Sequence, residues 1–325
     1  MLAVAADGYM PRPSQARPAA QAASPISARA RSDMRYRLLA LVLIGASMLG
    51  GCTEGVLDPK GPIAFAERQI LFNATGIMLA IVIPVVIATL GVAFWFRASN
   101  DHARYRPEFV YSGRLEMLVW SIPLMTILLT GTVAWIGAYD LDPPKPIASS
   151  TKPIKVQAIS LDWKWLFIYP ELGVASVNHL TIPVGTPVSF ELTSSGVMNS
   201  FFVPQLAGQI YTMAGMVTRL NLRADYAGTY RGLSANFSGD GFADMHFNVD
   251  AMPPERFAQW VSSTGSTGPV LDSKSYADLA KPSAAVTPFT YHSVAPGLFD
   301  SIRTTSMQSD AALCRSYPTS MRAEK

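Results

Sequence analysis

Hydrophobic positions are most concentrated in two long runs that contain no charged residue, one from Ile70 to Phe96 and one from Met117 to Tyr139. A helix rises about 1.5 Å per residue, so each run is long enough to cross a hydrocarbon core of about 30 Å. Pro84 and Pro123 lie inside the runs, and membrane helices tolerate proline better than soluble helices do. The pattern predicts a two-helix transmembrane hairpin over residues 70–139.

The loop between the two runs is rich in arginine. Its charged residues are Arg97, Asp101, Arg104, Arg106, Glu108 and Arg114. Because Lys and Arg collect on the cytoplasmic side of membrane proteins, the loop is predicted to be cytoplasmic. Both outer flanks of the hairpin are then on the exported side of the membrane.

The N-terminal region has the pattern of a leader. Residues 1–33 are rich in Ala, Ser, Pro and Arg, which indicates a disordered leader or a true start at Met34. A basic and then apolar stretch over 34–51 is typical of a lipoprotein signal peptide. It ends Leu49-Gly50-Gly51-Cys52, similar to a bacterial lipobox, so Cys52 is predicted to be acylated. The alternative is a small buried cysteine at the end of a first membrane helix, which the short apolar stretch disfavours.

Beyond a linker at 140–150 the chain changes to short β-branched and aromatic stretches punctuated by Pro and Gly. The clearest are Lys155–Leu161, Leu180–Ile182, Val188–Thr193 and Met245–Val249. This rhythm predicts an exported antiparallel β-sandwich or barrel over 151–262. The segment Pro253–Val261 reads as a short closing helix with proline near its start.

The remaining segments flank these domains. Residues 52–69 are predicted to be an exported N-terminal segment, and 263–325 a C-terminal arm and disordered tail. Within the tail, Tyr276–Ser283 and Phe289–Ile302 carry enough apolar residues to dock on another surface.

Composition agrees with membrane segments. Hydrophobic residues make up 49% of the chain and charged residues 15%, whereas soluble domains carry about a quarter charged residues. The net charge of +3, without a basic block, gives no reason to expect a nucleic-acid partner. The two cysteines, Cys52 and Cys314, stand at opposite ends and indicate no disulfide framework.

Three stretches carry a family resemblance. They are Leu115–Pro123, with Glu116 followed by Trp-x-x-Pro; the aromatic segment Asp162–Pro170; and Met198–Pro204. In this order, behind this topology, they resemble subunit II of the haem-copper respiratory oxidases. The resemblance implies a membrane-anchored fold of a two-helix transmembrane hairpin plus an exported all-β, cupredoxin-like sandwich.

The stretch from Gly232 to Met245 decides which branch of the family the chain resembles. Copper-bearing members read Cys-x-Glu-x-Cys-Gly-x-x-x-His-x-x-Met here, with a further His upstream. The matching positions in this chain are Asn199, Ser234, Asn236, Ser238, Phe242 and Met245. A binuclear copper centre needs thiolates and imidazoles, and one thioether cannot replace them. We therefore expect no metal at this site.

The lost ligands resemble the quinol-oxidising branch, of the cytochrome bo type. The resemblance implies a non-catalytic subunit of a proton-translocating quinol oxidase, in the bacterial inner membrane with its C-terminal domain on the periplasmic side. It implies that partner subunit I holds the haems, the copper and the quinol site, beside further small membrane subunits. One alternative is a stand-alone lipid-anchored cupredoxin-like binding or sensing module. Another is electron transfer through an unconventional metal, which the ligand count disfavours.

Four side chains near these motifs have a functional and a structural interpretation. Glu116 is either an interfacial capping carboxylate or, as the resemblance implies, the mouth of a proton pathway into subunit I. Trp163 and Trp165 match an electron-transfer platform in copper-bearing relatives, but without copper we expect them to pack at the oxidase interface. His246 alternates with core-facing Phe247, so it is predicted to be a surface residue and not a ligand.

Overall fold

The computed structural model describes residues 55–104 and 108–306. The predicted leader at 1–33, the signal peptide at 34–51, the acylation site Cys52 and the second cysteine Cys314 lie outside the described residues.

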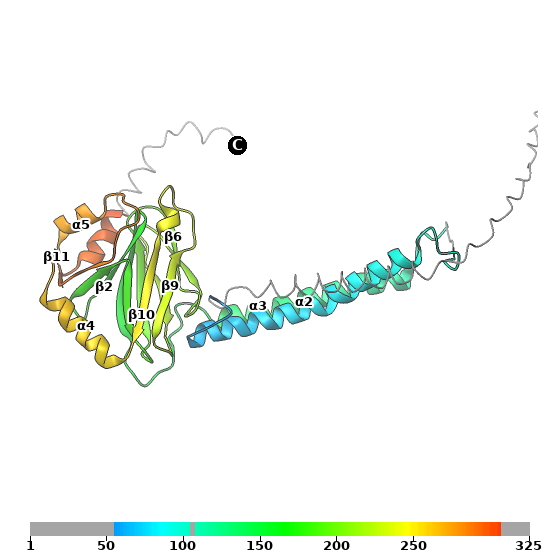
Figure 1. Ribbon diagram of the computed structural model, residues 1–325, viewed down its shortest axis with the longest axis horizontal. Coiled ribbons are helices and arrows are strands. Elements are labelled where there is room, and N and C mark those ends of the chain that lie inside the picture. The colour runs from blue at the N-terminus through cyan, green and yellow to red at the C-terminus, as the bar shows by residue number, and fades with distance from the viewer. Residues whose placement is uncertain (1–54, 105–107, 307–325) are drawn as a thin grey trace, which may run out of the picture. The chain divides into compact units, whose positions relative to one another are not determined.

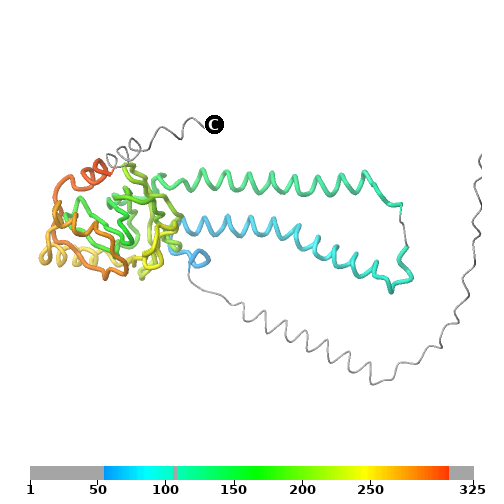
Figure 2. Tube along the Cα trace, turned by 90° about the horizontal axis from the view of Figure 1, so that it is seen from above, coloured from blue at the N-terminus to red at the C-terminus, as the bar shows by residue number. Residues whose placement is uncertain are grey.

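Two long helices, α2 (Pro62–Trp95) and α3 (Gly113–Asp140), contain the two charge-free runs. Both are long and apolar enough to cross a membrane, and almost none of their surface is buried inside the protein. Each helix passes its internal proline without ending. Ile70 of α2 lies against Gly137 of α3, where a methyl group on the glycine would meet the Ile70 side chain at 2.5 Å. The predicted hairpin is confirmed, with both helices somewhat longer than the runs (Figure 2).

Both ends of the hairpin are hydrogen-bonded to the β-domain. Before α2, the Lys60 N–H donates to the Gln205 carbonyl at 2.7 Å. After α3, the Asn221 side chain donates to the carbonyl of Pro144 at 3.0 Å. The two helix ends nearest the β-domain therefore lie on the same side of any membrane that the hairpin crosses, as the arginine-rich loop predicts.

The β-domain is a sandwich of two sheets (Figure 1). The six-stranded sheet has the order β12-β3-β2-β1-β5-β8. Its strands are β1 (Ile154–Leu161), β2 (Lys164–Tyr169), β3 (Val174–Val177), β5 (Val188–Ser194), β8 (Thr218–Leu222) and β12 (Phe289–Tyr291). The five-stranded sheet has the order β4-β10-β9-β6-β7. Its strands are β4 (His179–Pro183), β6 (Asn199–Phe202), β7 (Gln209–Thr212), β9 (Gly228–Ser234) and β10 (His246–Met252).

Smaller elements complete the domain. They are the 3-10 turn η1 (Phe242–Asp244), the helices α4 (Pro254–Ser266) and α5 (Ser273–Leu279), and the short parallel pair β11 (Val270–Leu271) and β13 (Ser293–Val294). The predicted sandwich is therefore present. Most of its strand pairs are antiparallel, but β1 pairs with β5, and β4 with β10, in parallel.

The core between the two sheets is aromatic. Trp165, Phe167 and Phe201 pack there with Phe247, whose ring stacks on Phe201 at 5.2 Å between centroids. Gly232 is opposite Phe247 in the β9–β10 register, and the Phe247 ring fills the space that a side chain on the glycine would need. The alternation predicted for β10 is confirmed, because Phe247 is buried and His246 is exposed.

A second core lies on the other face of the six-stranded sheet. There Leu166 and Ile168 of β2 pack with Leu298, Phe299 and Ile302 from the C-terminal arm. Strand β12 of the arm also pairs with β3. The arm predicted within 263–325 is folded onto this face as far as the described residues extend, to residue 306, and the division predicted at residue 262 falls within α4. The physical reason is that this face of the sheet is apolar, so it requires a cover (Figure 1).

Candidate functional site

The six positions that match the copper ligands of the family come together at one end of the sandwich. Asn199 begins β6, Ser234 ends β9, and Met245 directly precedes β10. These three strands are neighbours in the five-stranded sheet. The connection from β9 to β10 carries the remaining three positions, Asn236, Ser238 and Phe242. Positions that are spread over residues 199–245 of the sequence therefore lie at neighbouring strand ends and in the loop between two of these strands.

Asn199 and Ser234 bond to each other. Both are buried, and the Ser234 hydroxyl donates to Asn199 Oδ1 at 2.9 Å. The Asn199 amide nitrogen donates to the Val197 carbonyl at 3.1 Å. These polar side chains therefore use their hydrogen-bonding groups within the protein.

The other positions also bond or pack locally. Ser238 Oγ lies 3.9 Å from the Met245 sulfur, and Met245 is buried in the inner core. The Asn236 side chain donates to the Met198 carbonyl at 3.1 Å. The Phe242 ring packs edge-on against Phe237, with 5.5 Å between ring centroids.

The donor set of this cluster suits copper poorly. It consists of two hydroxyls, two amides, a phenyl ring and one thioether, whereas binuclear copper requires thiolates and imidazoles. Within residues 55–104 and 108–306, no three His, Cys, Asp or Glu side chains come close enough to hold a metal ion. His246, next to Met245, points to the exposed face of β10.

Trp163 packs on the loop between β9 and β10, which carries Asn236, Ser238 and Phe242. It lies in the turn between β1 and β2 with a φ of 63°, in the left-handed region. Its indole N–H donates to the Ser238 carbonyl at 3.1 Å. A methyl group on Gly241 would lie 2.5 Å from the indole ring, so only glycine allows this approach. Sequence reasoning missed this contact, although the glycines at 239 and 241 were a usable signal for it.

Trp165 is not an interface residue, and that prediction is wrong. Its side chain has no exposed surface, and its ring lies 5.4 Å from Phe201 and 5.8 Å from Phe247, centroid to centroid. Trp165 lies within β2 and faces the inner core, whereas Trp163 precedes the strand. Packing of the half-buried Trp163 against another subunit stays a prediction.

Lys164, between the two tryptophans, is a residue that sequence reasoning missed. Its side chain is only 1% exposed, and its amine donates to the carbonyls of Asp162 and Lys281 and to the Ser283 hydroxyl. Burial lowers the pKa of Lys164, and the nearby Asp162 carboxylate opposes that shift. A lysine inside an aromatic strand was the available signal.

Glu116 lies in the first turn of α3 and is exposed. Its backbone N–H donates to the Ser112 carbonyl at 3.0 Å. The structure therefore places a carboxylate that the rest of the chain leaves uncovered at the N-terminal end of the second helix, next to the arginine-rich loop. Its role in proton transfer stays a prediction.

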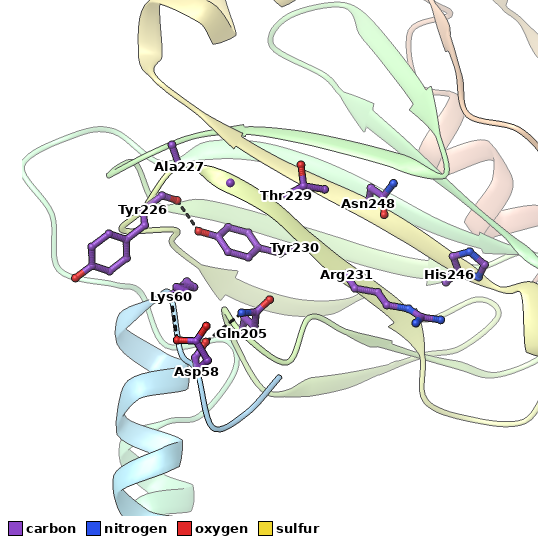
Figure 3. Close-up of a pocket in the computed structure, with 11 residues that line it drawn as sticks. Asp58, Lys60, Gln205, Tyr226, Ala227, Thr229, Tyr230, Arg231, His246 and Asn248 are labelled. Atoms are coloured by element: carbon purple, nitrogen blue, oxygen red, sulfur yellow. Dashed lines mark hydrogen bonds and ion pairs between the residues drawn. The ribbon is translucent and has the colours of Figure 1, made fainter. Parts of the chain in front are cut away.

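A pocket of about 660 Å³ lies outside this cluster, on the solvent face of β9 and β10 (Figure 3). Arg231, His246 and Asn248 line it together with Lys60, which is paired with Asp58 at 2.9 Å. None of the six positions lines this pocket.

Known proteins resemble the chain along most of its length. The family model described as the COX aromatic-rich motif matches residues 266–309. The cytochrome bo(3) ubiquinol oxidase subunit 2 of Pseudomonas aeruginosa is 46% identical, over 81% of this chain and 80% of that one. The ubiquinol oxidase subunit 2 of Acetobacter aceti is 44% identical, over 83% and 90%.

Among solved structures, one similar to part of the chain is the periplasmic domain of cytochrome oxidase subunit II from Bradyrhizobium japonicum. It is 21% identical with a TM-score of 0.33, and the match covers 35% of this chain and 96% of that one.

Proposed function

The chain belongs to the family of quinol oxidase subunit 2, and on that premise we propose that it is the copper-free subunit II of a quinol-oxidising, proton-translocating terminal oxidase. Its relatives are subunits of an oxidoreductase complex, which implies partner oxidase subunits such as subunit I. The two apolar helices and these relatives indicate an inner-membrane protein with a periplasmic domain.

The observation that carries the proposal is the bond between Ser234 and Asn199. Two of the positions that match copper ligands bond to each other, and no thiolate or imidazole replaces them. Electrons from cytochrome c then have no metal to enter on this chain. In this proposal quinol delivers electrons to subunit I, which holds the haems and copper, and this chain braces and covers that subunit.

Copper analysis tests the missing centre. The purified full chain, incubated with copper and then desalted, is expected to retain no stoichiometric copper by elemental analysis. The matched control restores four donors through Asn199→His, Ser234→Cys, Ser238→Cys and Phe242→His, and copper retention by that variant shows that the assay can detect a site. Two coppers per unmodified chain, with the visible absorption of a thiolate centre, would overturn the proposal.

Co-purification tests the partner. The full chain, extracted in mild detergent, is expected to bring with it a haem-bearing membrane subunit whose complex consumes oxygen with quinol. A chain that purifies free of haem, from membranes that retain quinol oxidase activity without it, would instead favour a stand-alone lipid-anchored module.

We further propose that Glu116 collects protons from the cytoplasm for subunit I. The support is its exposed carboxylate at the start of α3 and the tendency of ionisable residues at membrane depth to be functional. Glu116→Gln removes the ionisable group but keeps the size, so we expect normal haem content and a several-fold slower turnover. Glu116→Asp should retain more activity because it keeps the charge.

Oxygen consumption per haem in the purified complexes measures both effects. The matched control is Glu108→Gln, which changes an exposed carboxylate in the loop that precedes α3 and should leave turnover unchanged. Full activity per haem in the Glu116→Gln complex would reduce Glu116 to an interfacial capping residue.

We also propose that Cys52, which lies outside the described residues, is the acylated N-terminus of the mature chain. Mass spectrometry of the membrane-extracted protein should find no residue before Cys52 and a lipid mass on it. Cys52→Ala should block this processing while the two helices keep the chain in the membrane, because acyl chains anchor more weakly than a transmembrane helix. A mature chain that begins at Met34 would contradict the proposal.

A further inference from the structure

Lys164 connects the sandwich to the C-terminal arm. Among the described residues it is the only Lys, Arg, Asp or Glu in the buried class, with 1% of its surface exposed. Its amine donates to the Lys281 carbonyl at 2.7 Å and to the Ser283 hydroxyl at 2.6 Å, both in the arm. The third bond, at 3.2 Å, goes to the Asp162 carbonyl in the β1–β2 turn. All three N–H groups of the ammonium are therefore satisfied.

A second side chain fixes the same stretch of the arm. The Asn178 amide nitrogen donates to the Val286 carbonyl at 2.9 Å. Its oxygen accepts from the Trp165 backbone N–H at 2.8 Å. The arm over residues 281–286 is thus held by the side chains of Lys164, the first residue of β2, and Asn178, which lies between β3 and β4.

The turn that precedes Lys164 also contacts the loop between β9 and β10, which carries Asn236, Ser238 and Phe242. Trp163 lies between Asp162 and Lys164, and its indole bonds to the Ser238 carbonyl. Gly241 packs against the face of that indole. Since Trp163 and Lys164 share one peptide bond, the backbone position that the arm imposes on Lys164 also fixes where the indole lies.

The loop, Ala235–Asp244, is tied at its start, where the Ala235 N–H donates to the Ser200 carbonyl and the Asn236 side chain donates to the Met198 carbonyl. In its middle, over residues 237–241, the hydrogen bonds to the rest of the sandwich run through Ser238. The contact from Ser238 to the Met245 sulfur is long, at 3.9 Å, and the Phe237 side chain is 73% exposed. Where a metal is present, coordination of loop residues supplies folding free energy to the site. This donor set cannot supply that coordination, and the short tie that holds the middle of the loop to the sandwich is the bond from the Trp163 indole to Ser238.

We propose that the C-terminal arm orders this loop through Lys164 and Trp163. The buried amine ties the turn to the arm, and the indole transmits that fixed position to Ser238 and Gly241. Lys164 is thus a positioning residue for a loop that it does not touch. In this proposal the arm has two roles. It covers the outer face of the sheet, and it fixes the conformation of the loop that carries Asn236, Ser238 and Phe242.

Hydrogen exchange of backbone amides in the full chain, purified in detergent, tests this coupling. Lys164→Met removes the three bonds and keeps an apolar stem, so amides of the arm and of the loop should both exchange about tenfold faster or more. The amide of Val184, which bonds to the Met252 carbonyl in a distant part of the sandwich, should keep its rate. Ser283→Ala removes one bond and should shift the same two regions by a smaller factor.

Two further variants determine the direction of the coupling. Lys281→Ala is the matched control, because the Lys281 side chain pairs with Asp278 while Lys164 uses the Lys281 carbonyl; loop exchange should not change. Trp163→Ala should speed exchange in the loop and leave the arm protected, since the indole acts after Lys164 in the proposed order.

Three results would overturn the proposal. One is a loosened arm with an unchanged loop in Lys164→Met. Another is an equal rise at the arm, the loop and Val184, which would mean global destabilisation. The third is a Lys281→Ala chain that matches Lys164→Met. If Lys164→Met does not fold, Ser283→Ala decides by the same criteria, because it leaves the buried amine in place.

Discussion

The two faces of the six-stranded sheet are both buried, but different parts of the chain cover them. The inner face packs on the second sheet through aromatic side chains that come from strands spread between residues 156 and 251. The outer face is covered by one late segment of the chain, between residues 271 and 302. The inner core therefore holds the two sheets together, whereas the outer core holds the C-terminal arm on one of them. Substitutions in the inner core should therefore lower the stability of the whole β-domain, whereas substitutions in the outer core should loosen only the C-terminal arm.

The largest effect is expected for Phe247→Ala in the inner core. The Phe247 ring lies 5.1 Å from Phe167 and 5.2 Å from Phe201, centroid to centroid, so its removal leaves a cavity between the sheets. The free energy of unfolding should fall by about 3–5 kcal/mol. Urea denaturation of the full chain in detergent, followed by the β-sheet signal in circular dichroism, measures the loss.

The control for this prediction is Phe237→Ala, which removes a ring that is mostly exposed. It should change the same free energy by about 0.5 kcal/mol or less. Equal losses in the two variants would mean that the inner core does not govern the stability of the sandwich.

An intermediate and local effect is expected for Phe299→Ala in the arm. Phe299 is buried in the outer core, but the arm can detach while the sandwich stays folded. That detachment limits the loss to about 1–3 kcal/mol. Proteolysis should cut the arm faster, with the denaturation midpoint of the sandwich little changed. Asp300→Ala is the control, because its pairing with Arg303 is exposed and contributes little. A sandwich midpoint that fell as far as in Phe247→Ala would remove the distinction between the two faces.

The smallest effect is expected for the pH dependence of the stability of the arm, through the residue that caps α5. Asp272 caps this helix by accepting a hydrogen bond from the Ser275 backbone N–H at 2.8 Å, and bonds from Ser275 hold the pKa of its carboxyl below the ordinary value of 3.8. The folded arm prefers the carboxylate, so this contribution is complete above pH 3.8 and is lost as pH falls through the lower, folded pKa. Asp272→Asn keeps a capping oxygen but cannot titrate.

Proteolysis of the arm at a series of acidic pH values, with an acid-active protease, measures this contribution. Cleavage of the unmodified chain should rise below pH 3.8 more steeply than cleavage of the Asp272→Asn chain. Parallel profiles would assign the acid sensitivity to other groups.

Much of the fold could be predicted because its signals are local. Two charge-free runs predict the helices, and alternation predicts which face of β10 is buried. The apolar stretches of the arm were predicted to dock on another surface, but which surface could not be predicted, because β12 pairs with β3 from more than a hundred positions further along the chain. Strand β2 is buried on both faces, so its sequence is apolar at successive positions and does not alternate with polar residues. The sequence therefore did not show that Trp165 faces the inner core while Leu166 faces the arm.

In the candidate site, too, some features could be predicted from the sequence and others could not. The family resemblance singled out Asn199, Ser234 and Met245 as matching positions, and the structure places them at the ends of neighbouring strands. Motif spacing could not show that Asn199 bonds to Ser234, because that bond depends on side-chain orientation within the folded sheet. It also could not show that Lys164 is buried, since the arm that buries it is distant in the sequence.

Strand β12 has a consequence for solubility. It occupies the edge of the six-stranded sheet beside β3, whose four residues are all buried. An uncovered apolar strand offers its free N–H and C=O groups to the same edge of another molecule. A chain cut ahead of Phe289 would thus keep its inner core but expose the unpaired edge of β3 and the apolar outer face of the sheet. We expect such a chain to aggregate under conditions in which the sandwich is still folded. The arm is in this sense a guard against self-association of the periplasmic domain.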